Sequence, residues 1–123
     1  MSAWAYVAAI LGAGLGSCAR FALGWLDTRK VFPWPTILAN ALGSALLGGV
    51  LAAGDDAALT AAWTFALGTG VAGGLSTFSS LAVDVLVMWK DGRRRGAVGY
   101  AVATLVAGLA AASAAYALVA ALA

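Results

Sequence analysis

The chain has 123 residues, of which 63% are hydrophobic and 10% charged, with no His and a single Cys. Soluble domains carry about a quarter charged residues, so this composition excludes a soluble domain and indicates an integral membrane protein. Without His and with one Cys, the chain also has too few ligands for a zinc or iron site of ordinary type.

Long charge-free runs predict four transmembrane helices in a single domain, residues 1–123. A helix needs about 20 mostly apolar residues to cross the hydrocarbon core, and each run is near or above that length. The predicted helices span residues 3–26, 34–53, 60–89 and 96–122. The fold class expected from this pattern is an all-α integral membrane protein.

The first helix, 3–26, lacks the basic residues that begin a secretory signal, so we expect it to be retained. Gly12 and Gly16 have the spacing that permits close packing against another helix. The lone Cys18 is interpreted as a small residue at a helix contact. Arg20 lies near the end of this helix, where it can reach the interface or line a vestibule that attracts anions.

The second helix begins after Pro33 and contains Pro35 in its first turn, and the third is predicted to break near its middle. Glycines at 68, 70, 73 and 74 are followed by hydroxyl residues at 76, 77, 79 and 80. Such a run weakens a helix, and a helix broken within lipid often marks an ion or substrate site.

The basic residues predict the orientation. If both termini lie on one side of the membrane, six of the seven Lys and Arg residues fall at the opposite side. The positive-inside rule makes that basic side cytoplasmic and places both termini outside. All five Trp residues fall at or near predicted helix ends, which is typical of the headgroup level.

The polar side chains of the predicted helices are mostly neutral hydrogen-bond donors. They are Thr36, Asn40, Ser44, Thr77, Ser80, Tyr100 and Thr104. Such groups bind an anion without the fixed charge that would hold it too tightly for conduction. Phe78 lies near mid-membrane and has an electropositive ring edge. These residues predict a small-anion pathway in an oligomer, and the lack of a nucleophile beside a base argues against an enzyme.

Three segments resemble the Fluc fluoride channels, also called CrcB. They match in order and spacing, and they are GAGLGSCARF at 12–21, PTILANALGS at 35–44 and GGLSTFSS at 73–80. The resemblance implies a passive channel in the cell membrane that exports fluoride and thereby limits its toxicity in the cytoplasm. It also implies an antiparallel (inverted) dimer with pores between the subunits and a structural Na⁺ at the dimer centre.

The resemblance also assigns residues. It places Asn40, Phe78, Ser79, Ser80, Tyr100 and Thr104 along the fluoride pore. Arg20 corresponds to the vestibule arginine of the family. The carbonyls of Gly73 and Ser76 would bind the Na⁺. The expected partners are fluoride, the lipid bilayer and a second subunit, with no nucleic acid.

Leu81 departs from the family pattern, which usually has a second Phe at this position. Together with the one-sided basic residues, it suggests that the chain inserts one way and pairs with a paralogous, inverted subunit. A homodimer is the other possibility.

Two alternatives to a fluoride channel remain open. A proton-coupled exporter of the small multidrug resistance type is also a four-helix antiparallel dimer, but it needs a carboxylate deep in the first helix, where this chain has none. A non-conducting membrane assembly subunit is the second.

Overall fold

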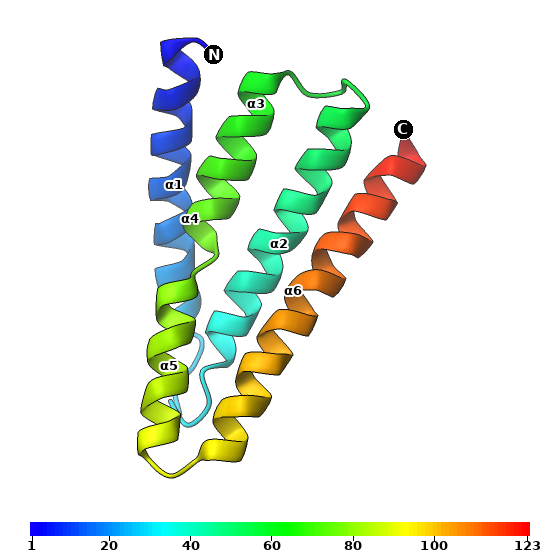
Figure 1. Ribbon diagram of the computed structural model, residues 1–123. Helices are drawn as coiled ribbons and strands as arrows, with labels where there is room; N and C mark the ends of the chain where they lie inside the picture. The colour runs from blue at the N-terminus through cyan, green and yellow to red at the C-terminus, as the bar shows by residue number, and fades with distance from the viewer.

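The computed structural model describes all residues, 1–123, and is helical throughout (Figure 1). Its helices are α1 Ala3–Gly24, α2 Trp34–Asp55, α3 Ala61–Phe65, the π-helix η1 Ala66–Ala72, α4 Gly73–Leu75, α5 Phe78–Lys90 and α6 Arg94–Leu122. The segments from α3 to α5 form one interrupted span, so four helical spans are long and apolar enough to cross a membrane. The all-α fold with four transmembrane helices and a broken third helix is therefore confirmed.

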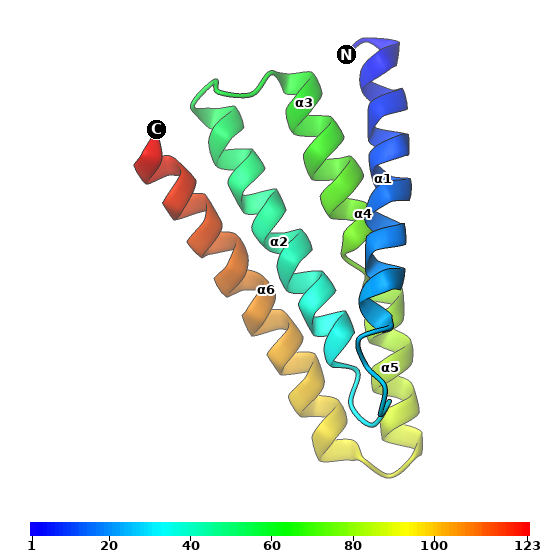
Figure 2. The same ribbon diagram turned by 180° about the vertical axis from the view of Figure 1, so that it is seen from behind.

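The four spans run up and down, and both termini lie at one end of the molecule (Figures 1 and 2). The connections 25–33 and 91–93 lie at the other end, where Arg93 donates a hydrogen bond to the carbonyl of Val31 at 2.6 Å. The largest helix contact joins α2 to α6, while α1 packs mainly on η1 and α4. The basic residues of both connections thus share one end, as the sequence predicted.

Glycines allow α1 to approach the third span closely. A Cβ atom on Gly16 would lie 2.7 Å from the amide nitrogen of Leu75, and one on Gly74 would lie 2.8 Å from the Cα of Ala13. Gly12 is less tightly confined, with the carbonyl oxygen of Ala66 at 3.2 Å from such an atom. The packing role predicted for Gly12 and Gly16 is confirmed, and Gly74 has a packing role as well.

The third span departs from regular α-helix in two places. Ser76 and Thr77 are extended, with φ, ψ of −78°, 156° and −152°, 125°. This is the break expected from the sequence. The sequence does not predict the π-helix at 66–72. Glycine weakens α-helix and π-helix alike, so the positions of the glycines do not distinguish the two.

The chain buries little of itself. Only 19 of its 123 residues are buried, and large apolar side chains such as Leu15, Phe78 and Leu105 are more than 60% exposed. In a membrane, lipid covers such side chains at no cost. The buried core is correspondingly small, with Met88, Ala97 and Tyr100 forming one cluster.

Candidate functional site

The break in the third span frees backbone groups near mid-membrane. Thr77 caps α5, since its Oγ1 accepts a hydrogen bond from the amide of Ser80 at 3.1 Å. The amide of Thr77 itself is turned away from the carbonyl of Gly73, which it would bond in a continuous helix. Groups freed in this way must find partners in the protein or in an ion.

Asn40 of α2 supplies those partners on one side. Its Oδ1 accepts from the amide of Thr77 at 2.6 Å, and its Nδ2 donates to the carbonyl of Thr77 at 3.1 Å. Asn40 is 9% exposed. The amide group has two N–H bonds, so one remains after the bond to Thr77.

The first helix supplies partners on the other side. Ser17 Oγ donates to the carbonyl of Gly74, and Arg20 Nη1 donates to the carbonyl of Ser76, both at 3.3 Å. The family resemblance places Arg20 at a vestibule and does not predict this contact with the break. A guanidinium has five N–H donors, so this bond leaves others for an anion.

Two grooves flank the break. The first, of about 430 Å³, lies between α2, α5 and α6, and its lining includes Asn40, Thr77, Phe78 and Thr104. Phe78 is 81% exposed. Thr104 donates its hydroxyl proton to the carbonyl of Tyr100 in its own helix at 2.8 Å, so this proton is not directed to the groove.

The second groove, of about 500 Å³, lies where α1, α2 and α5 meet. Its lining combines two cations with hydroxyl groups, and includes Arg20, Lys30, Ser17, Thr36 and Ser80. Ser80 and Phe78 therefore line different grooves, although both lie in the first turn of α5. Ser79 is another candidate pore residue. Its hydroxyl lies 3.2 Å from that of Thr77, and it lines neither groove.

A third polar cluster lies toward the basic end. The hydroxyl of Tyr100 donates to Asp84 Oδ2 at 2.8 Å, and Thr36 Oγ1 donates to the same oxygen at 3.2 Å. The sequence predicts Tyr100 as a pore donor and gives no role at the site to Asp84. A carboxylate within a transmembrane helix needs hydrogen-bond or ionic partners. The presence of Asp84 in a predicted span is therefore the sequence feature that indicates such a cluster.

The two carbonyls that the resemblance assigns to Na⁺, those of Gly73 and Ser76, both lie at the break. Unwound carbonyls are typical Na⁺ ligands in membrane proteins. The carbonyl of Gly73 has lost the amide of Thr77, and Gly73 is exposed on the surface of the chain. The carbonyl of Ser76 already accepts from Arg20, although a carbonyl oxygen has a second lone pair. One chain therefore presents two backbone oxygens at the break that could be ligands of a cation.

Comparisons with known proteins agree with the resemblance in the sequence. The family model "CrcB-like protein, Camphor Resistance (CrcB)" matches residues 7–116. A protein of Thermus thermophilus called fluoride-specific ion channel FluC is 39% identical over 107 residues, which cover 85% of this chain and 86% of that protein. A protein of the same name from Gloeobacter violaceus is 36% identical over 115 residues, with 89% and 91% covered. One from Bacillus licheniformis called fluoride-specific ion channel FluC 2 is 36% identical over 107 residues, with 85% and 78% covered.

Proposed function

Because this chain belongs to the CrcB-like family, we propose that it is a passive, fluoride-specific ion channel that exports fluoride across the cell membrane. The observation that carries the proposal is the broken third span, which sets Asn40 and Phe78 in one groove and Arg20 and Ser80 in the next. The names of its relatives specify the ion.

The side chains at the break suit a small, strongly hydrated anion. Arg20 and Lys30 in the second groove attract an anion from solution, and Ser80 offers a hydroxyl there. The second N–H of Asn40 and the ring edge of Phe78 are neutral contacts in the first groove. Donors fixed in place replace water around the ion, while the absence of a full charge at Asn40 and Phe78 permits release.

The open grooves favour a dimer. The pathway residues Asn40 and Phe78 line a groove that one chain leaves open, and the free N–H of Asn40 cannot face lipid without cost. A second, inverted subunit would cover it and form pores between the two chains. We propose a paralogous subunit as the partner, with the homodimer as the alternative, because Leu81 leaves this chain with one ring where the family has two.

The same arrangement accommodates the structural Na⁺. Two inverted chains would bring together four carbonyl oxygens, two from Gly73 and two from Ser76. The ion would fix the two breaks against each other, and Arg20 of each chain would hold the carbonyl of Ser76 in place.

Two other functions find less support. A small multidrug resistance-type exporter needs a carboxylate deep in its first helix, and α1 contains no acidic residue. A non-conducting assembly subunit is favoured only by Leu81. Unlike a channel subunit, it would contribute nothing to fluoride flux.

The test is fluoride efflux from liposomes that contain the purified full chain, read with a fluoride electrode and compared with chloride. Fluoride-selective efflux from the chain alone would establish a channel and a homodimer. Efflux only after a paralogous subunit is added would establish the heterodimer. A folded chain that gives no fluoride efflux in either preparation would refute the channel.

A further inference from the structure

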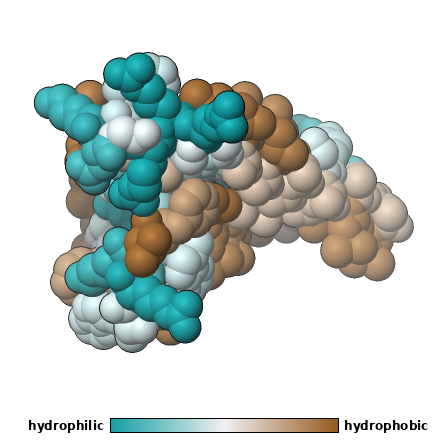
Figure 3. Space-filling model, turned by 90° about the horizontal axis from the view of Figure 1, so that it is seen from below, coloured by the Kyte–Doolittle hydropathy of each residue, from teal (hydrophilic) through white to brown (hydrophobic).

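The end of the molecule that carries the basic residues contains a site separate from the grooves at the break. Figure 3 shows hydrophilic side chains gathered over this end. A shallow groove lies there at the junction of α5 and α6, lined by Trp89, Arg94, Arg95, Val98 and Gly99. None of these residues lines a groove at the break or contributes to the cluster around Asp84.

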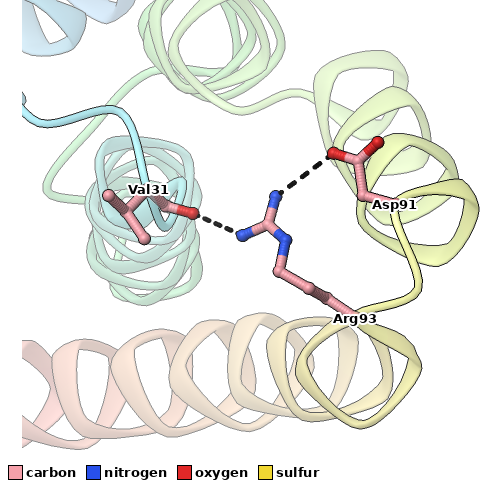
Figure 4. Close-up of polar contacts among 3 residues, drawn as sticks. All are labelled: Val31, Asp91 and Arg93. Atoms are coloured by element: carbon pink, nitrogen blue, oxygen red, sulfur yellow. Dashed lines mark hydrogen bonds and ion pairs between the residues drawn. The ribbon is translucent and has the colours of Figure 1, made fainter.

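The two arginines of this groove have no anionic partner in the chain. The structure contains one ion pair, between Arg93 and Asp91 at 3.7 Å, and Arg93 also bonds the carbonyl of Val31 (Figure 4). Arg93 is thus occupied in joining the two connections. Arg94 and Arg95 are exposed and their side chains make no hydrogen bond, so their guanidinium groups are available to an external anion.

The surroundings of the arginines indicate the depth at which that anion lies. The guanidinium of Arg94 stacks over the ring of Trp89, 5.0 Å from its centroid. Trp is favoured at the headgroup level of a bilayer, so the stacked pair lies at the depth of the lipid phosphates. Guanidinium groups bind phosphate oxygens in pairs, with a geometry that an ammonium lacks.

The rest of the groove leads from this level into the hydrocarbon. Val98 and Gly99 follow Arg94 and Arg95 by one turn of α6, which places them about 6 Å deeper. A Cβ atom on Gly99 would meet nothing within 4 Å, and Val98 is 54% exposed. The groove is therefore cationic at the headgroup level and apolar and open just below it.

We propose that Trp89, Arg94 and Arg95 bind the phosphate of an anionic phospholipid, whose acyl chain lies in the notch over Gly99. A basic residue attracts an anionic lipid that lies next to it by about a factor of five, and this attraction falls off within a Debye length of about 10 Å. A site of this form fits a lipid better than free phosphate, because free phosphate has no use for the apolar notch. In an inverted dimer of two copies, one such site would face each leaflet.

The test is native mass spectrometry of the purified full chain, equilibrated in detergent with equal amounts of phosphatidylglycerol and phosphatidylcholine of distinguishable mass. We expect preferential retention of phosphatidylglycerol. Arg94→Gln and Arg95→Gln should each lower the preference about fivefold, and the double variant about 25-fold. Arg29→Gln, which removes one charge at the same end but outside the groove, should leave the preference within about twofold.

A second variant tests the notch without changing the charge. Gly99→Leu fills open space, so it should fold normally and still lower phosphatidylglycerol retention. Retention unaffected by Gly99→Leu, or lost when millimolar inorganic phosphate is added, would replace the lipid with a free phosphate and overturn the proposal. Equal retention of the two lipids by the unaltered chain, or an equal effect of Arg29→Gln and Arg94→Gln, would also overturn it.

Discussion

At the scale of single residues, Asn40 combines two tasks, because it holds both backbone groups of Thr77 and lines the first groove. Asn40→Asp keeps the acceptor for the Thr77 amide but loses the donor to its carbonyl. An unpaired buried carbonyl costs about 1–3 kcal/mol, and the added negative charge repels fluoride. We expect a lower unfolding temperature and at least about a tenfold loss of fluoride efflux, the equivalent of about 1.4 kcal/mol.

Ser113→Ala is the control for Asn40→Asp, since Ser113 is exposed on α6 and lines neither groove at the break. It should fold and conduct close to the unaltered chain. Full fluoride efflux through Asn40→Asp would remove Asn40 from the pathway, even if the variant were less stable.

Phe78 and Leu81 form a pair of opposite tests. Both line the first groove, and they are three residues apart on one face of α5. Phe78→Leu removes the only ring of the groove, whereas Leu81→Phe adds the second ring that the family pattern contains. If a ring contact contributes about 0.5–1.5 kcal/mol, efflux should fall about two- to tenfold in the first variant and rise in the second. The same response in both variants would contradict the ring contact.

At the scale of elements, the approach of α1 to the third span decides stability. Gly16→Ala places a methyl group 2.7 Å from the amide nitrogen of Leu75, so the two segments have to separate. Overpacking of this kind costs about 1–3 kcal/mol. Gly14→Ala is the control, because its methyl group meets nothing within 4 Å. Denaturation in mixed micelles should show a lower midpoint for Gly16→Ala alone, and equal midpoints would contradict the close contact.

The same elements show what the sequence could and could not predict. The four spans follow from local composition, because apolar runs have to be helical in lipid. The break follows from it as well, because clustered glycines and hydroxyl residues weaken a helix. The π-helix at 66–72 and the bond from Tyr100 to Asp84 depend on how the spans pack. The hydroxyl of Thr104 was expected at the pathway, yet it bonds its own helix, an alternative that sequence spacing leaves open for any Thr.

At the scale of the whole molecule, the distribution of charge predicts a single orientation in the membrane. The basic residues of the two connections lie together at one end. At the other end, the only charged side chains are those of Asp55, the last residue of α2, and Asp56, which follows it. Lys and Arg are retained on the cytoplasmic side during insertion, so both termini should lie outside. A C-terminal alkaline phosphatase, active only outside, should be active, and a C-terminal green fluorescent protein, fluorescent only inside, should be dark.

Reducing the difference in basic residues, from six against none to six against two, should weaken this preference. Asp56 and Ala58 are exposed in the connection between α2 and α3, so Asp56→Lys with Ala58→Lys adds two cations at the acidic end without disturbing packing. Because orientation follows the difference in Lys and Arg between the two ends, both reporters should then give signal. Strong signal from both reporters on the unaltered chain would instead mean that it already inserts both ways, and an inverted homodimer would need no second gene product.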